Sequence, residues 1–205
     1  VDTPRQRANL KAVAETWGRK CDGFFAASNI TDHSLGAIDL VHQGEEEYEN
    51  MWQKIRSMWA YAYDHYLEEY DFFHICGDDV YIAVENLRSF FDGPDVLRLE
   101  KGYLDEISGH PDYVDKASKW NSSEYYKDVH GLSARPLWFG SPGRHRKSVF
   151  PCGGPGYTMN RAALEFFGKV GLPSYLASNK DSREDIFMGS FFTQHWIFLS
   201  HVTDR

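Results

Sequence analysis

Two adjacent carboxylates follow a short run of apolar residues in the first half of the chain. The run 71–76 predicts a buried strand, and it leads directly into Gly77, Asp78 and Asp79. In sheets that are covered by helices, ligands bind at the carboxyl ends of the strands. Hard oxygen ligands at such a place favour Mg²⁺ or Mn²⁺, and such an ion commonly holds a diphosphate. Aspartate also stabilises turns after strands, and the pair alone favours neither interpretation.

The second half of the chain contributes two further candidate features. The loop Gly153–Tyr157 has glycine at 153, 154 and 156, which lets the backbone approach a ligand closely, although a sharp turn needs the same residues. Glu184 and Asp185 lie at the predicted start of a helix, where the helix dipole favours carboxylates without any further role. If one of them faces a cleft, it could serve as a general base.

The elements that must position these residues alternate between helix and strand. A capping box at Thr3–Gln6, with Pro4 at the first helical position, starts the first helix. Helices are expected over 3–17, 46–68, 86–91, 161–169 and from 182 onward, and strands over 24–28, 71–76, 137–140 and 196–199. This alternation predicts an α/β domain with a mostly parallel sheet that is flanked by helices on both faces.

The composition fits one globular domain and narrows the class of partner. The 205 residues are 42% hydrophobic and 25% charged, with 22 Lys and Arg against 30 Asp and Glu. The net charge of −8 argues against duplex nucleic acid or an anionic membrane as the main partner. It also argues against a viral RNA polymerase, whose catalytic hairpin contains a similar Gly-Asp-Asp. The polar, turn-rich stretch 93–135 is expected to be an insertion or lid within a single domain covering 1–205.

The cysteines and the N-glycosylation sequons bear on metal binding, on disulfides and on the cellular compartment of the protein. Cys21, Cys76 and Cys152 form no C-x-x-C pair, so a structural zinc site is not expected, and either one disulfide or none is open. Sequons at Asn29 and Asn121 fit a protein of the secretory pathway. The chain begins at Val1 and has no apolar run long enough to cross a bilayer. We therefore expect it to be part of a longer protein.

Five motifs in this order resemble the β1,3-glycosyltransferases of glycosyltransferase family 31. The core 1 β1,3-galactosyltransferase branch is the most similar, and fringe is more distant. The resemblance covers nearly the whole chain apart from 93–135. The motifs are Thr16–Cys21, Cys76–Ile82 with Glu85–Arg88, Leu137–Gly140, Gly153–Tyr157, and Glu184–Gly189.

The resemblance implies a GT-A fold, a UDP-sugar donor, Mn²⁺ and inversion at the anomeric carbon. By position, Asp79 matches the main metal ligand and Asp78 the carboxylate beside it. Asp185 matches the general base, with Glu184 as second choice. The residues matching the wall near donor and acceptor are Gly153, Gly154, Gly156 and Tyr157.

Three departures from the family pattern qualify these expectations. Gly77 stands where the first of three acidic residues is usual, which puts a contact on the ribose side of the donor in doubt. Pro155 replaces the usual alanine of the glycine loop. The family's histidine metal ligand would lie just beyond Arg205, so the chain as given is expected to bind metal poorly.

The implied reaction is transfer of galactose from UDP-galactose to the 3-hydroxyl of O-linked N-acetylgalactosamine on a glycoprotein or glycopeptide. The alternatives are a β1,3-transferase with another UDP-sugar, such as a fringe-like N-acetylglucosaminyltransferase, and a non-catalytic folding chaperone related to the branch. Trp138 could stack on the acceptor or belong to the core. The expected location is the lumen of the Golgi or endoplasmic reticulum, through an N-terminal membrane anchor of the full-length protein, and a homodimer is open.

Overall fold

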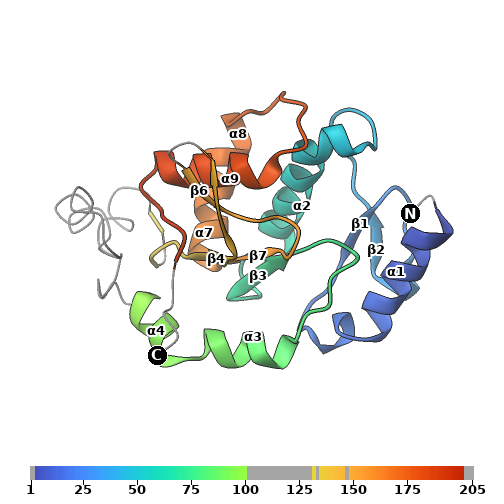
Figure 1. The fold of residues 1–205 in the computed structure, drawn as a ribbon, viewed down its shortest axis with the longest axis horizontal. Helices are drawn as coiled ribbons and strands as arrows, with labels where there is room; N and C mark the ends of the chain where they lie inside the picture. The colour runs from blue at the N-terminus through green and yellow to red at the C-terminus, as the bar shows by residue number, and fades with distance from the viewer. Residues whose placement is uncertain (1–2, 101–130, 133, 146–147, 201–205) are drawn as a thin grey trace.

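The computed structural model describes residues 3–100, 131–132, 134–145 and 148–200, which form helices and strands (Figure 1). The helices are α1 Pro4–Glu15, α2 Met51–Tyr66, α3 Val84–Phe91, α4 Pro94–Glu100, α7 Arg161–Phe166, α8 Leu172–Ser174 and α9 Glu184–Gln194. The strands are β1 Ala26–Ser28, β2 Ala37–Asp39, β3 Phe72–Ile75, β4 Trp138–Gly140, β5 Pro142–His145, β6 Ser148–Pro151 and β7 Tyr157–Asn160. They alternate only in the first part of the chain, because α3 and α4 are consecutive helices, β4 to β7 are consecutive strands, and α7 to α9 are again helices. The expected α/β class is confirmed.

The predicted start of α1 is confirmed in detail. The Gln6 amide donates to Thr3 Oγ1 at 3.2 Å, and the Thr3 amide donates to Gln6 Oε1 at 3.1 Å. This reciprocal pair satisfies backbone donors that the first turn of a helix leaves without partners. The buried face of the helix carries Leu10 and Val13, and Trp17 extends the same face beyond its end.

The central sheet has the strand order β3-β7-β4, and both of its ladders are antiparallel. The prediction of a mostly parallel sheet is therefore wrong. Within the described part of the chain, the parallel ladder is the short pair β1-β2, and β5-β6 forms an antiparallel pair. The loop 153–156 joins β6 to β7, and β7 then runs opposite to β3, so that Ile75 pairs with Tyr157 and Phe72 with Asn160.

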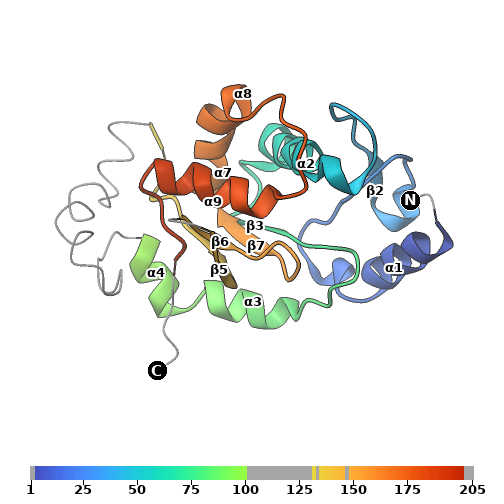
Figure 2. The same cartoon turned by 45° about the horizontal axis from the view of Figure 1, so that its top comes forward.

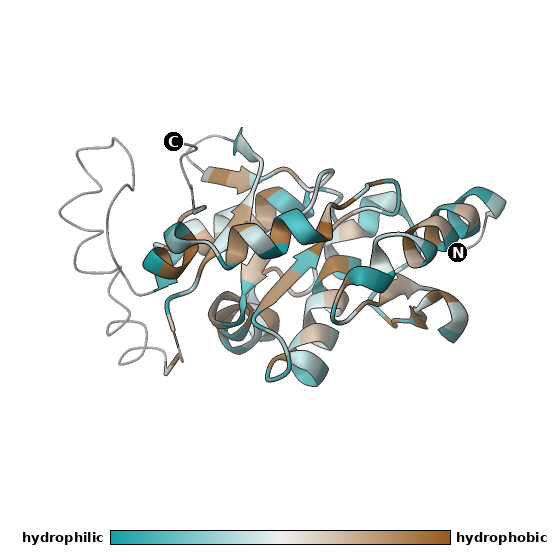
Figure 3. Cartoon of the chain, turned by 90° about the horizontal axis from the view of Figure 1, so that it is seen from below, coloured by the Kyte–Doolittle hydropathy of each residue, from teal (hydrophilic) through white to brown (hydrophobic). Residues whose placement is uncertain are grey.

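Helices cover both faces of the central sheet, as expected (Figure 1). Phe73 and Ile75 face the main core, which α2, α7 and α9 complete. Phe72, which precedes Phe73 in the strand, points to the opposite face and stacks on Phe91 of α3, with ring centroids 4.3 Å apart. This alternation follows from the two-residue period of a strand. Figure 3 shows hydrophilic and hydrophobic residues interspersed along the helices.

The C-terminal elements differ from the prediction in two places. The expected strand 196–199 is not a strand, because Trp196 has a φ of 61° and breaks the extended backbone. The segment instead touches β4 through the Ser200 amide, which donates to the Trp138 carbonyl at 2.8 Å. The helix expected over 161–169 is α7 followed by a wider π-helical turn, Phe167–Gly171.

Part of the predicted lid lies outside the described residues. Positions 101–130 and 133, which include the sequon at Asn121, belong to that part. The start of the segment is helical, since Pro94 opens α4 two residues after α3 has ended. Cys21, Cys76 and Cys152 carry free thiols. Among the helices that the structure describes, none is both long and apolar enough to span a bilayer.

Candidate active site

β3 ends at the turn that carries the first acidic pair. Asp78 and Asp79 are both exposed there, and within the described residues neither forms an ion pair. A Cβ atom at position 77 would come within 2.9 Å of Asp79 Oδ1, so the Asp79 side chain folds back over Gly77. The glycine that departs from the family pattern therefore leaves the space that this carboxylate uses.

The two carboxylates fit part of a coordination shell for a divalent cation. They are hard oxygen donors, they are exposed, and they lie at a strand end, which suits Mn²⁺ or Mg²⁺. The described part of the chain contains no group of three or more His, Cys, Asp or Glu side chains that could hold a metal. Asp78 and Asp79 would thus supply two protein ligands, and further ligands would have to come from a bound diphosphate, from water or from other residues.

The glycine loop is a closed turn pressed against the end of β3. The Gly156 amide donates to the Gly153 carbonyl at 3.0 Å. Gly156 has a φ of 90°, and a Cβ there would lie 2.4 Å from the Ile75 carbonyl oxygen and 2.7 Å from Cys76 Cβ. Gly154, by contrast, is exposed and a Cβ there would meet no atom within 4 Å. Glycine at 156 is required by the fold, whereas glycine at 154 leaves room for a ligand.

Gly156→Ala should lower the free energy of unfolding by at least about 2 kcal/mol, because it adds a left-handed backbone strain to a clash with the β3 backbone. Gly154→Ala is the matched control and should change stability by less than about 0.5 kcal/mol. Urea unfolding of the two variants measures both values. Equal destabilisation by the two substitutions would contradict the described loop geometry.

The second acidic pair opens α9 and holds the same loop. Asp185 is half-buried, and its Oδ2 accepts a hydrogen bond from the Gly153 amide at 3.0 Å, while Oδ1 accepts one from the Ile186 amide at 2.7 Å. Glu184 is 8% exposed, and its Oε2 accepts a hydrogen bond from the Tyr157 hydroxyl at 3.0 Å. α9 also packs against β6, as Figure 2 shows. The two neighbouring carboxyl groups therefore differ in their surroundings: Asp185 is half-buried and bonded to backbone amides, whereas Glu184 is buried and bonded to a tyrosine hydroxyl.

Burial, and secondly the charge of Asp185, raise the pKa of Glu184 from 4.5 to about 8. The carboxyl group is therefore neutral at pH 7. Since the folded state keeps a proton that the unfolded chain releases above pH 4.5, raising the pH toward 8 favours unfolding. The loss amounts to about 1.4 kcal/mol per pH unit within that window.

Tyr157 is a buried residue of this cluster. Its side chain is 1% exposed, and its hydroxyl accepts a hydrogen bond from Trp59 Nε1 at 3.2 Å. Burial, followed by the charge of Glu184, raises the pKa of the Tyr157 hydroxyl. Trp138 is fully buried and packs on Phe192, so it belongs to the core and is no stacking surface for a ligand.

The structure brings the later motifs together and leaves the first acidic pair beside them. Hydrogen bonds join Gly153 to Asp185 and Tyr157 to Glu184. Gly156 lies against Cys76, the residue before the acidic turn. Within the described residues, no hydrogen bond or ion pair joins the acidic turn to the two carboxyl groups of α9.

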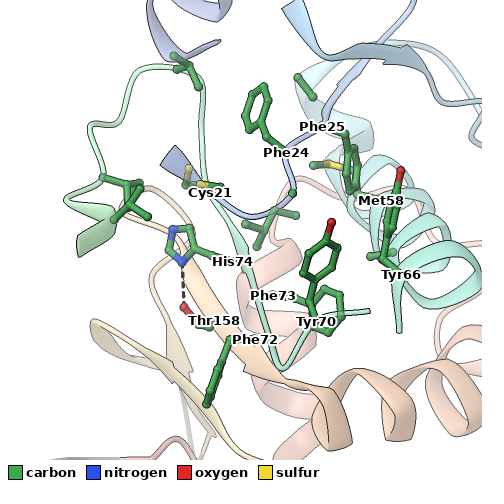
Figure 4. A pocket seen from close by; sticks show the side chains of 18 of the residues that line it. Cys21, Phe24, Phe25, Met58, Tyr66, Tyr70, Phe72, Phe73, His74 and Thr158 are labelled. Carbon is green, nitrogen blue, oxygen red and sulfur yellow. Dashed lines mark hydrogen bonds between the residues drawn. The ribbon is translucent and has the colours of Figure 1, made fainter. Parts of the chain in front are cut away.

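Asp78 of this acidic turn lines a cleft of about 1180 Å³, of which Figure 4 shows other wall residues. It runs between the N-terminal segment, α2 and β3, and Cys76, Gly77 and Asp78 line it near the turn. Most of its wall is aromatic or apolar, including Phe24, Phe25, Met58, Tyr66, Tyr70, Phe72 and Phe73. Such a wall suits a flat ring system. The acidic turn would bind the anionic end of the same ligand through a divalent cation.

Two residues of this region carry no functional signal in the sequence. His74 lines the cleft, with its Nδ1 2.9 Å from Thr158 Oγ1, as the dashed line in Figure 4 shows. Trp59 reaches Tyr157 from the apolar face of α2. A histidine within an apolar strand and a tryptophan within an amphipathic stripe both indicate core positions when only the sequence is read.

Comparison with known proteins shows a similarity to a galactosyltransferase. No family model matches the chain. The chain is 28% identical over 187 residues to glycoprotein-N-acetylgalactosamine 3-beta-galactosyltransferase 1 of Xenopus laevis. The match covers 89% of this chain and 41% of that protein, so the chain spans about two fifths of the length of its relative. The resemblance expected from the order of the motifs is confirmed.

Proposed function

We propose that the chain transfers galactose from UDP-galactose to the 3-hydroxyl of O-linked N-acetylgalactosamine on glycoproteins, with inversion at the anomeric carbon. The similarity to a glycoprotein-N-acetylgalactosamine 3-beta-galactosyltransferase supports the class of reaction. The order of the five motifs and a mixed helix-and-strand domain, with helices on both faces of its central sheet, support a GT-A fold.

The observation that carries the proposal is the position of Asp185. It is half-buried, and the Gly153 amide fixes its carboxylate at 3.0 Å. A carboxylate held in this way can accept the proton of an acceptor hydroxyl. In the proposed step the 3-hydroxyl oxygen bonds to the anomeric carbon as the bond from that carbon to the diphosphate breaks, and Asp185 takes the proton.

The acidic turn would hold the donor's diphosphate through a divalent cation. Asp78 and Asp79 would bind the ion, which we propose is Mn²⁺, and when bound it would offset negative charge on the leaving UDP. The aromatic cleft that begins at Asp78 would take the nucleoside. This arrangement explains why a chain of net charge −8 needs no basic surface to meet a diphosphate.

A luminal compartment of the secretory pathway is part of the proposal. It is supported by the name of the relative, which gives glycoproteins as its substrates. Membrane anchoring in the Golgi and a homodimeric state are proposed for the full-length protein on the resemblance alone. The donor could instead be another UDP-sugar, because a single hydroxyl contact can change donor choice.

The proposal is tested by transfer from radiolabelled UDP-galactose to a peptide that carries O-linked N-acetylgalactosamine. Transfer should require Mn²⁺, and EDTA should reduce it to background, because the acidic turn alone cannot neutralise the leaving diphosphate. The same peptide with UDP-N-acetylglucosamine as donor is the matched alternative assay. Mn²⁺-independent transfer would contradict the metal assignment, and no transfer from any UDP-sugar by the full-length protein would favour the chaperone.

A further inference from the structure

The proposed reaction leaves one buried titratable group without a task. Glu184 is 8% exposed and sits next to the proposed base, Asp185. Its Oε2 accepts from Tyr157, whose hydroxyl in turn accepts from the indole of Trp59, so a chain of hydrogen bonds runs from α9 through β7 to α2. Each link is buried. Such a chain fixes the first turn of α9 relative to the main core.

Glu184 also contacts the backbone of the glycine loop. A Cβ atom at position 153 would lie 2.3 Å from Glu184 Oε1, so the carboxyl group packs directly on Gly153. The amide of the same glycine donates to Asp185 at 3.0 Å. Gly153 is therefore clamped between the two neighbouring carboxyl groups, one of which packs on its Cα while the other accepts from its nitrogen.

We infer that Glu184 is a positioning residue that holds the Gly153–Gly156 loop against α9 and thereby fixes Asp185 for proton transfer. The inference rests on the proposed function, in which Asp185 is the base. When two neighbouring carboxyl groups have surroundings that give them different pKa values, one commonly acts as the base and the other as the acid or as a support. The protonated neighbour also leaves Asp185 as the single anion of the pair.

The groups that face Glu184 define what its ionisation would do. Asp185 comes from its own helix and Tyr157 from β7, while α2 contributes the uncharged indole of Trp59 and the loop contributes the backbone of Gly153. Among the described residues, no cation is hydrogen-bonded to Glu184. Ionisation would therefore place a second negative charge beside Asp185 without a counter-ion, and the clamp on Gly153 would loosen.

The test is the pH profile of kcat in the full chain. The wild type should lose turnover on a basic limb near pH 8, where Glu184 ionises. Glu184→Gln keeps an oxygen acceptor for Tyr157 but cannot ionise, so the basic limb should disappear while kcat at pH 7 falls by less than about tenfold. Tyr157→Phe should move the limb to higher pH, because the Tyr157 hydrogen bond lowers the pKa of Glu184. Glu15→Gln at an exposed position of α1, where Glu15 pairs with Lys11, is the matched control and should keep the wild-type profile.

Two results would overturn the inference. If Glu184→Gln loses as much turnover as Asp185→Asn, Glu184 itself handles the proton. If Glu184→Gln keeps the basic limb at its original pH, the ionisation of Glu184 does not control Asp185.

Failure of the proposed function is recognised separately, by absence of transfer in the wild type. The inference then depends on hydrogen exchange of the Gly153 amide, which reports its bond to Asp185 without any substrate. Between pH 7 and 9 this protection should fall in the wild type and in Glu15→Gln but persist in Glu184→Gln. Equal loss in all three proteins would overturn the inference.

Discussion

Asp185→Asn should reduce sugar transfer by about 10²–10⁴-fold, which is the usual contribution of a general base. The amide is nearly the same size as the carboxylate, and its oxygen can still accept from Gly153, so the loop should keep its place. The hydrogen bond from the Ile186 amide is then lost, because the amide has one acceptor oxygen where the carboxylate has two. The substitution removes the negative charge and the capacity to take a proton. We therefore expect kcat to fall while KM for the donor changes by less than about twofold.

Three measurements separate this effect from a loss of fold. Asp185 lies in the first turn of α9, where losing a negative charge costs about 0.3–1 kcal/mol, and thermal unfolding will show that cost. Mn²⁺-dependent UDP binding should be preserved. Asp64→Asn, at an exposed position of α2, removes one charge elsewhere and is the matched control for kcat. Full turnover by Asp185→Asn would show that another group accepts the proton.

The sequence predicted those features whose cause is local. The capping box at Thr3 and the turn after β3 both depend on residues within a few positions of one another. The glycine loop is similar, because a φ of 90° at Gly156 needs glycine whatever surrounds it. Features that depend on neighbouring residues in this way can be predicted from the sequence alone.

Strand direction could not be predicted in the same way. A short apolar run reads alike whether its neighbours are parallel or antiparallel, and the pairing of Ile75 with Tyr157 joins residues far apart in the chain. The failed strand at 196–199 has a related cause, since an apolar run does not reveal the positive φ of Trp196. Long-range geometry decided both cases.

The difference in burial between Glu184 and Asp185 can be predicted in part from the sequence. Glu184, Met188, Phe191 and Phe192 follow a helical spacing and are all buried. That pattern indicates that Glu184 faces the core. The partners in the core, Tyr157 and Trp59, come from other elements, and no local pattern connects them to α9.

Asp79→Ala should weaken Mn²⁺-dependent UDP binding by at least about 10–100-fold, since even the outer partners of metal ligands contribute that much to affinity. The Asp79 carboxylate is exposed and folds over Gly77, so its removal disturbs no buried contact and the thermal midpoint should stay near that of the wild type. Calorimetric titration of UDP, with Mn²⁺ and with EDTA, measures the effect directly.

The comparison with neighbouring variants decides between a metal ligand and a turn residue. Asp79→Asn keeps a side chain that can stabilise a turn but removes its charge. If Asp79 only stabilises the turn, the UDP affinity of Asp79→Asn should equal that of the wild type. If Asp79 binds the metal, the UDP affinity of Asp79→Asn should fall to that of Asp79→Ala. Asp64→Ala on α2 controls for the change in net charge. Equal UDP affinity with and without Mn²⁺ in the wild type would contradict the assignment of Asp78 and Asp79 as metal ligands. If binding depends on Mn²⁺ and both Asp79 variants lose it, the turn after β3 carries the donor's diphosphate, as proposed.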